Sequence, residues 1–397
     1  MDYFHYQNDR LFAEEVDVLD AARKIKTPFY LYSKRTILHH FHQIQEAFQE
    51  VRPLICFSVK SNSNHTLLNI LNRNGSGFDL VSGWELKRVL RAGGDPRKTV
   101  FAGVGKTREE MLWALKAGIF MFNCESVNEI LLLDRLARDL DRYADIAIRI
   151  NPDIVPKTHR HIITGKKDTK FGISVYEVKK VLKIVRDCTR IRLKGLHFHI
   201  GSQITETAPY IQTIHRMLKL IDELRKARFP VEYLNIGGGL GIIYNKEKPA
   251  TPAEFSAKVI PLIRGRDLKL IMEPGRYIVG NSGILVTRVT YIKKSLNKIF
   301  VVVDAGMNSL IRPALYEAYH DIWPLVRRKK TFTVDVVGPI CETGDLFAKD
   351  RVIGRVEENE YLAFKSAGAY GMVMASTYNS RPLPGEVLAD GRRFKLI

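Results

Sequence analysis

From residue 53 onward, short apolar runs alternate with longer segments whose apolar residues recur three and four positions apart. The short runs have the length and β-branched content of buried strands, and the longer segments have the period of helices. Strands are predicted at 54–59, 78–81, 99–102, 119–123, 145–150, 193–200, 233–236 and 268–272. Helices are predicted between them, for example at 64–73, 83–92, 108–117, 126–140, 175–187 and 210–227.

Eight strands alternating with helices over about 220 residues predict a (β/α)₈ TIM-like barrel, with a doubly wound sheet as the alternative. After Arg276 the helical period fades, and a mostly β second domain, sandwich-like or barrel-like, is predicted. We expect the barrel at 34–274 and the second domain at 1–33 with 275–397. Its predicted strands are 283–291, 299–303, 331–337, 361–364 and 393–396, joined by an earlier run at 29–32.

The length of 397 residues agrees with two domains, and 62 Lys and Arg against 43 Asp and Glu give a net charge of +19. The basic residues are spread along the chain, and the densest runs, 327–330 and 166–167, lack interleaved aromatics. A solvated basic surface is therefore favoured over a nucleic-acid site.

The four cysteines lie far apart, and no apolar run is long enough to span a membrane or to form a signal peptide. We expect a reduced, cytoplasmic protein.

Two loops carry the strongest chemical signal. Gly237-Gly238-Gly239-Leu240-Gly241 and Glu273-Pro274-Gly275-Arg276 each follow a predicted strand. A glycine run alone is more often a tight turn, but it also lets backbone N–H groups approach an anion. The last two loops of a barrel typically form its phosphate site. An acid and an arginine beside them suit a ligand with a phosphate and a protonated nitrogen.

Lys60 directly follows the first predicted strand and precedes a polar stretch, Ser-Asn-Ser-Asn. A lysine there is usually a solvated surface residue, but this one could form a Schiff base with an aldehyde cofactor. His197 and His199 point to one face of a strand, yet no third ligand supports a metal site. His197 is interpreted as a hydrogen-bonded core residue, and His199 could stack on a cofactor ring. The set predicts a pyridoxal phosphate pocket, with Glu273 on the pyridine nitrogen.

Several motifs are shared with one enzyme family. The sequence resembles the fold-type III pyridoxal-phosphate-dependent decarboxylases, and within them the diaminopimelate decarboxylases, from about Thr27 to Glu386. Some pieces, such as Glu-Pro-Gly-Arg, belong to the wider superfamily. Matching stretches are Thr27-Pro-Phe-Tyr-Leu-Tyr32, Gly103-Val-Gly-Lys106, Asn151-Pro-Asp153, Lys170-Phe-Gly172, Phe198-His-Ile-Gly-Ser-Gln203, Asp304-Ala-Gly-Met-Asn308, Arg312-Pro-Ala-Leu-Tyr316, Gly338-Pro-Ile-Cys-Glu342 and Gly368-Ala-Tyr-Gly371.

The resemblance implies roles for individual residues. Lys60 would anchor the cofactor and His199 would cover its ring. The phosphate would be held by Ser202, Gly237, Gly238, Gly239, Gly275 and Tyr370. The substrate would be bound by Arg276, which also adjoins the cofactor, and by Arg312, Tyr316, Tyr370 and Glu342. Cys341 would donate a proton from the partner subunit of a homodimer. The chain departs from the family at Ser58 and Ser61, where alanines are commoner, and at Trp84, where glycine is usual.

The implied reaction is decarboxylation of meso-2,6-diaminopimelate to L-lysine and CO₂, the last step of lysine biosynthesis. The long connection 151–172 would act as a lid that excludes water. Decarboxylases of ornithine, arginine or carboxynorspermidine are the nearest alternatives, but a second substrate carboxylate needs an extra cation, and Arg276 and Arg312 supply two. A racemase of the same fold is disfavoured. A non-catalytic pyridoxal phosphate carrier would not need Arg312, Tyr316, Cys341 and Glu342.

Overall fold

The computed structural model describes residues 2–154 and 169–397, and its chain divides into two compact units. The barrel unit comprises Phe41–Gly241 and Pro249–Gly275. The β unit comprises Met1–His40, Ile242–Lys248 and Arg276–Ile397. The return of Ile242–Lys248 to the β unit was not expected from the sequence, because so short a segment carries no periodic pattern.

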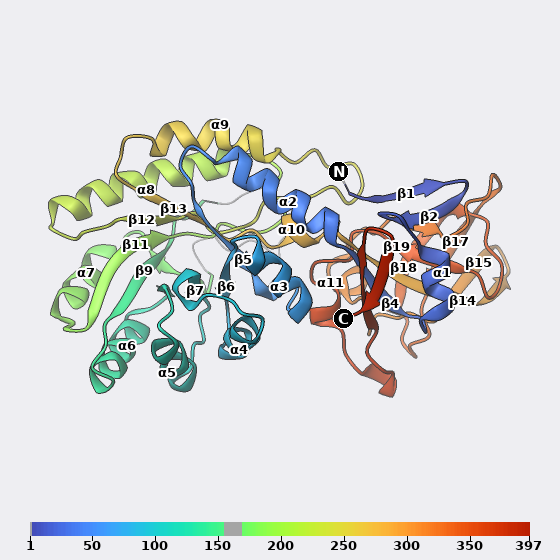
Figure 1. Ribbon diagram of the computed structural model, residues 1–397, viewed down its shortest axis with the longest axis horizontal. Helices are drawn as coiled ribbons and strands as arrows, with labels where there is room; N and C mark the ends of the chain where they lie inside the picture. The colour runs from blue at the N-terminus through green and yellow to red at the C-terminus, as the bar shows by residue number, and fades with distance from the viewer. Residues whose placement is uncertain (1, 155–168) are drawn as a thin grey trace. The chain divides into compact units, whose positions relative to one another are not determined.

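The barrel unit is a closed ring of parallel strands, as predicted (Figure 1). Pairing of β13 with β5 and of β8 with β9 closes the ring, which excludes an open doubly wound sheet. A short strand, β10 (Ile173–Ser174), pairs with β9 outside the ring. The eight barrel strands are β5 (Leu54–Ser58), β6 (Gly77–Leu80), β7 (Thr99–Phe101), β8 (Met121–Cys124), β9 (Ala144–Asn151), β11 (Ile191–His197), β12 (Tyr233–Asn235) and β13 (Lys269–Met272).

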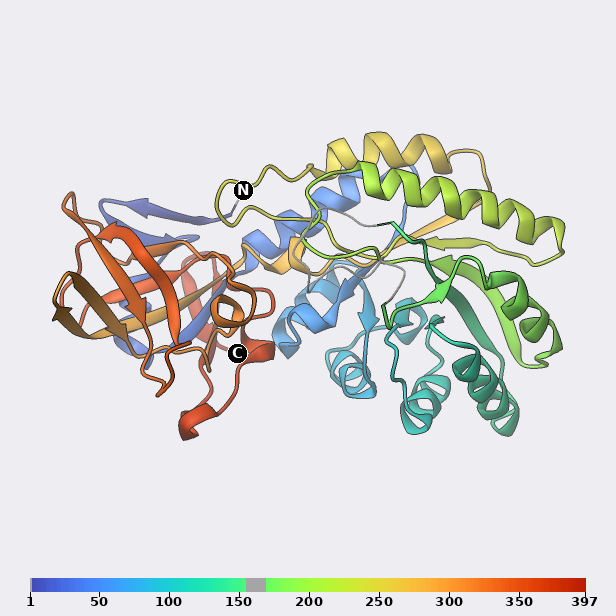
Figure 2. The ribbon, with the colours of Figure 1, turned by 180° about the vertical axis from the view of Figure 1, so that it is seen from behind.

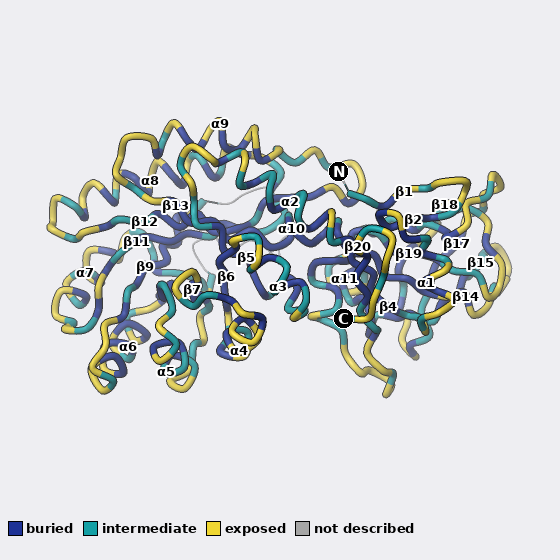
Figure 3. Tube along the Cα trace, viewed as in Figure 1, coloured by how far each residue is buried: buried dark blue, intermediate teal, exposed yellow. Residues whose placement is uncertain are grey.

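Helices surround these strands, as the view from behind also shows (Figure 2). The strands are almost continuously buried, whereas the helices alternate between buried and exposed positions (Figure 3). Thr107 and Thr251 begin their helices with capping boxes closed by Glu110 and Glu254. The helices are α2 (Lys34–Ala47), α3 (His65–Arg73), α4 (Gly83–Arg91), α5 (Arg108–Ala117), α6 (Val127–Asp139), α7 (Val178–Asp187), α8 (Ala208–Lys226) and α9 (Pro252–Ile263).

The β unit contains a sheet in the order β18-β17-β15-β14-β4-β20-β21, with β16 and β19 attached. The predicted run at 29–32 is β4 (Phe29–Ser33), which pairs with β14 and β20 and so joins this domain as expected. Short helices α10 (Arg276–Val279) and α11 (Arg312–Tyr316) precede and interrupt the strands. The other strands are β14 (Gly283–Ser295), β15 (Lys298–Val303), β16 (Ile322–Pro324), β17 (Thr331–Val337), β18 (Leu346–Gly354), β19 (Tyr361–Phe364), β20 (Gly385–Asp390) and β21 (Arg393–Leu396).

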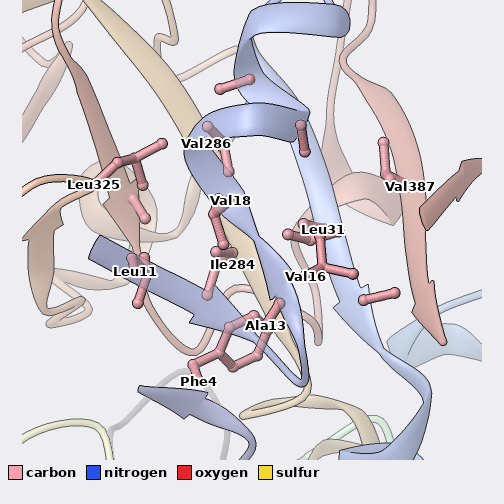
Figure 4. Packing of buried hydrophobic residues seen from close by; sticks show 14 of the residues in the cluster. Phe4, Leu11, Ala13, Val16, Val18, Leu31, Ile284, Val286, Leu325 and Val387 are labelled. Atoms are coloured by element: carbon pink, nitrogen blue, oxygen red, sulfur yellow. The ribbon is translucent and has the colours of Figure 1, made fainter. Parts of the chain in front are cut away.

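The N-terminal segment completes the core of the β unit. Strands β1 (Phe4–Gln7), β2 (Arg10–Ala13) and β3 (Val16–Asp17) form a small antiparallel sheet, followed by helix α1 (Val18–Lys24). Their apolar side chains pack against those of β4, β14 and β20 (Figure 4). This segment was not predicted as structured, because its strands are too short to show a period.

The connection 151–172 falls mostly on residues 155–168, which lie outside the described residues together with the basic pair at 166–167. Its described ends are β9, which finishes at Asn151, and Gly172, whose amide donates to Glu125 Oε2 (3.1 Å). None of the described helices is long and apolar enough to cross a membrane.

Candidate active site

Lys60 lies in a 3₁₀ turn (Val59–Ser61) at the carboxyl end of β5. Its Nζ donates to Oδ2 of Asp79 (2.7 Å), and the Ser58 hydroxyl donates to the same oxygen (2.7 Å). About a third of the Lys60 side chain is exposed, whereas Asp79 is fully buried. The amine is therefore held at the barrel mouth while one side of it remains accessible, as its predicted role requires.

Asp79 is the first functional residue that the sequence reasoning missed. Burial and the nearby Glu273 carboxylate raise the pKa of Asp79, and Lys60 only partly offsets them. Its Oδ1 is buried without a hydrogen-bond partner in the described chain. The signal available in the sequence was an acid inside an apolar strand, because a buried carboxylate is rarely placed there without a function.

Glu273 follows β13 and is almost completely buried. Its Oε1 accepts from the side-chain amides of Asn123 (2.9 Å) and Asn235 (2.6 Å). Burial alone would raise the pKa of Glu273, but His197, Lys60 and the Asn235 amide outweigh burial and hold it well below its usual value. An ionised carboxylate is thus fixed at the position where the sequence predicts a partner for a protonated pyridine nitrogen.

The two histidines occupy different surroundings. His197 is buried as expected, and its Nε2 lies 3.3 Å from Oε2 of Glu273. This burial agrees with the interpretation of His197 as a core residue, and the side chain that it faces is the carboxylate of the site. His199 accepts from the Gly238 amide at Nδ1 (3.2 Å), and burial together with Arg149 and Lys60 lowers its pKa well below the usual value.

The glycine run closes on the ends of neighbouring strands. A Cβ on Gly237 would collide with the Phe198 carbonyl, one on Gly238 with the Glu273 carbonyl, and one on Gly239 with the Gly201 carbonyl. The amide of Gly237 already donates to Asn235 (2.9 Å) and that of Gly238 to His199. In the described chain the Gly239 amide donates to no protein acceptor. The run therefore packs closely against the ends of the neighbouring strands, and a side chain at any of the three positions would not fit.

These residues fit pyridoxal phosphate. A partly exposed primary amine suits its aldehyde, an ionised buried carboxylate suits its protonated ring nitrogen, and the glycine turn admits a phosphate. The histidine ring of His199, kept neutral, suits its ring face. Ser202 and Gly275 lie on loops after β11 and β13, and a Cβ on Gly275 would meet Ser58 and Ser61 at 2.9 Å.

A second group of residues lies within the β unit and is called the arginine cluster here. It comprises Arg276 and Arg312 with their neighbours Tyr244, His320 and Tyr370. Arg276 donates to the Tyr244 hydroxyl (2.6 Å), and its guanidinium lies 4.9 Å from the Tyr370 ring centroid. Arg312 lies 4.7 Å from the Tyr244 ring centroid and donates to His320 (3.0 Å). Both arginines are almost fully buried, and no carboxylate in the described chain pairs with Arg312. Burial and the charge of Arg276 lower the pKa of Arg312. Two buried positive charges held together indicate an anion site.

Tyr244 and His320 were also missed by the sequence reasoning. No sequence signal marked Tyr244, whereas His320 follows the Arg-Pro-x-x-Tyr motif by only a few residues. Tyr316 ends helix α11 and is partly buried. Burial by itself would lower the pKa of Arg276, but Tyr244, Tyr370 and Tyr316 together raise it above its usual value.

Cys341 and Glu342 stand on an exposed loop of the β unit. The Cys341 amide donates to Asn379 Oδ1 (3.0 Å), and Glu342 hydrogen-bonds with Tyr378. Buried Asp345 shapes the loop by accepting from the amides of Ile340 and Met307 (2.6 Å each). In the described chain, no hydrogen bond or ion pair joins Cys341 or Glu342 to the arginine cluster.

The three positions that depart from the family pattern, Ser58, Ser61 and Trp84, have different surroundings in the structure. Ser58 donates to Asp79, and Ser61 donates to the Ser58 carbonyl (2.7 Å), so both hydroxyls support the Lys60 turn. Trp84 is about two thirds exposed, and its ring lies in a T-shaped arrangement with that of Trp113, with the centroids 5.8 Å apart.

The family described as pyridoxal-dependent decarboxylase, pyridoxal binding domain, matches residues 34–280. Diaminopimelate decarboxylase of Vibrio cholerae is 46% identical over 100% of this chain and 96% of its own length. The chain belongs to the diaminopimelate decarboxylase family. Another member, from Aquifex aeolicus, is 44% identical over 100% of this chain and 94% of its own length.

Solved structures of family members have the same fold. Diaminopimelate decarboxylase from M. jannaschii, in complex with L-lysine, superposes with a TM-score of 0.95 at 34% identity, covering 100% of this chain and 94% of its own. The Helicobacter pylori enzyme, also with L-lysine, gives 0.92 at 38% identity, covering 96% and 95%. As a family member, the chain is a pyridoxal-dependent decarboxylase with the pyridoxal-binding domain on its barrel.

Proposed function

We propose that this enzyme decarboxylates meso-2,6-diaminopimelate to L-lysine and CO₂. The observation that carries the substrate is the buried pair Arg276 and Arg312, of which Arg312 has no carboxylate partner in the described chain. Diaminopimelate keeps a second carboxylate through the reaction, whereas ornithine and arginine have none to offer. A pair of arginines binds a carboxylate by their planar forks.

Bound pyridoxal phosphate supplies an electron sink for the electron pair left when CO₂ departs. Lys60 would hold the cofactor covalently, and the ionised Glu273 would keep a proton on its pyridine nitrogen. Asp79 accepts a hydrogen bond from the Lys60 ammonium, so it orients that amine. His199 would cover the ring. Ser202, Gly237, Gly238, Gly239, Gly275 and Tyr370 would surround the phosphate.

Substrate recognition and protonation would use the β unit. Arg276, Arg312, Tyr316 and Tyr370 would hold the carboxylate that L-lysine retains. Glu342 would take the distal ammonium, and the Cys341 thiol would protonate the carbon that loses CO₂.

We propose that Cys341 and Glu342 act on the active site of a second copy in a homodimer. Both are exposed, and among the described residues neither makes a hydrogen bond or an ion pair with the arginine cluster of its own chain. An exposed thiol survives in a reducing compartment, which supports a cytoplasmic location. Residues 151–172 would exclude water, although residues 155–168 lie outside the described chain.

An absorbance spectrum of the purified protein, followed by addition of meso-diaminopimelate and assay of lysine and CO₂, tests the function. A band of lysine-bound cofactor that disappears in Lys60→Ala, together with lysine production, supports it. Turnover of ornithine or arginine instead would move the chain to another decarboxylase. A band with no turnover of any amino acid would favour the carrier.

A further inference from the structure

His320 is buried within the β unit, where its ring lies between the Arg312 guanidinium and the backbone carbonyl of Lys365. Arg312 Nη1 donates to its Nε2 (3.0 Å), and its Nδ1 lies 2.7 Å from the Lys365 carbonyl oxygen. A guanidinium only donates and a carbonyl only accepts. The ring must therefore accept at Nε2 and donate at Nδ1, which fixes one neutral tautomer.

The surroundings keep the ring neutral. Burial lowers the pKa of His320 to about 3, and the charges of Arg312, Arg276 and Arg351 act in the same direction. The His320 and Tyr244 rings are T-shaped to one another, with centroids 5.6 Å apart. Its own carbonyl accepts from Arg351 Nη1 (3.0 Å), so backbone and ring are both held in place.

A neutral hydrogen-bond acceptor can hold an arginine beside an anion site without neutralising the charge of that arginine. A carboxylate in the place of His320 would pair with Arg312 and cancel the charge that a ligand carboxylate needs. The imidazole instead takes one N–H of the guanidinium and leaves its positive charge intact. The other N–H groups of Arg312 keep a fixed direction, because Nη1 is fixed.

We infer that His320 is a positioning residue for substrate binding, which orients Arg312 toward the carboxylate that the product retains. The inference rests on the proposed role of Arg312. The competing explanation is that His320 only anchors the chain at Lys365, through Nδ1.

Two substitutions separate these explanations. His320→Gln places an amide near the position of Nε2 and can accept from Arg312. His320→Asn places its amide near the position of Nδ1, so it can reach the Lys365 carbonyl but not Arg312. Both are compared in the cofactor-loaded enzyme, with the cofactor band and thermal unfolding as measures of folding. L-Lysine, which has a carboxylate, and cadaverine, the same diamine without one, serve as inhibitors.

We expect His320→Asn to raise KM for diaminopimelate and the inhibition constant of L-lysine about tenfold, the usual effect of one lost hydrogen bond to a charged group. The inhibition constant of cadaverine and the cofactor band should not change. His320→Gln should keep both constants within about threefold of the wild type. The inference is overturned if the Asn variant binds L-lysine as the wild type does, or if both inhibitors weaken equally.

The variant Arg312→Met shows whether a failed result concerns the proposed function, the role of Arg312 or only the role of His320. If it leaves L-lysine affinity unchanged while diaminopimelate is still decarboxylated, the role of Arg312 is wrong and the function stands. If it weakens L-lysine binding but His320→Asn does not, only the inference on His320 fails.

A measurement on the wild-type enzyme covers the case in which His320→Asn does not fold. The ¹⁵N resonances of His320, assigned by their absence in His320→Gln, should report a neutral Nδ1–H ring. The Nε2 resonance should shift when L-lysine saturates the site and should not shift with cadaverine. A protonated ring, or a resonance that does not respond to L-lysine, overturns the inference.

Discussion

The Lys60 ammonium and the Asp79 carboxylate form an ion pair of 2.7 Å at the barrel mouth, one partner accessible and the other fully buried. The pair holds the amine that would bind the cofactor, and it also compensates a carboxylate whose burial is costly without a partner.

Replacing Lys60 should therefore have two separable effects. Lys60→Ala and Lys60→Arg should both lose the cofactor band and all measurable activity, because neither has a primary amine. Only Lys60→Ala leaves Asp79 without a cation. Its free energy of unfolding should fall by about 1–2 kcal/mol, discounted for the partial exposure of Lys60, while Lys60→Arg stays near the wild type. Equal stability of the two variants, measured by denaturant unfolding without cofactor, would contradict a stabilising role of the pair.

Glu273→Gln should lower kcat by about a hundredfold or more, because a neutral amide cannot hold a proton on the pyridine nitrogen. The substitution keeps the size of the side chain between Asn123 and Asn235. The cofactor band should remain, since Lys60 is intact. A variant with wild-type kcat would show that the carboxylate has no electronic role.

The glycine run can be tested with a matched pair. A Cβ on Gly238 would collide with the Glu273 carbonyl, whereas one on Gly105 meets nothing within 4 Å. Gly238→Ala should weaken cofactor binding at least tenfold and shift the Glu273 segment. Gly105→Ala should change stability by no more than about 0.5 kcal/mol and leave cofactor affinity unchanged. Titration with pyridoxal phosphate measures both, and similar affinities would argue against close packing at the run.

Acid should destabilise the β unit through His320. Its pKa is lowered from 6.5 to about 3, so the unfolded chain takes up the proton below pH 6.5 while the folded chain does not until about pH 3. The stability present above pH 6.5 is therefore lost as the pH falls toward 3. From pH 7 to pH 5 the wild type should lose about 2 kcal/mol more than His320→Gln, which has no titrating ring. Parallel stability curves for the two proteins would contradict a buried neutral imidazole.

Shared active sites can be tested by mixing inactive variants. Lys60→Ala and Cys341→Ala should each be inactive alone. If Cys341 serves the other subunit, a mixed dimer has one intact site, and random exchange of equal amounts should restore about a quarter of wild-type activity. If Cys341 serves its own chain, no mixture regains activity. Sedimentation of the mixture verifies that dimers have formed.

Much of the site could be predicted because its residues follow buried strands. The barrel strands are apolar on both faces, so each run is visible in the sequence, and Lys60, Glu273 and the glycine run stand directly after such runs. Asp79, Asn123 and Asn235 lie inside the strands, where a single polar residue does not reveal which neighbour it meets. Their convergence on Glu273 and Lys60 depends on the closure of the ring.

The sequence by itself determined the alternation of strands and helices, the change to β structure after Arg276, and the residues at the strand ends, because these depend on local hydrophobic period. The resemblance to a known family already joined Arg276 and Arg312, but only the tertiary structure decided which residues surround them. Tyr244 is distant in the sequence from both arginines, and the return of Ile242–Lys248 to the β unit brings it to them. Their buried charges and the tautomer of His320 follow from packing, which no local pattern encodes.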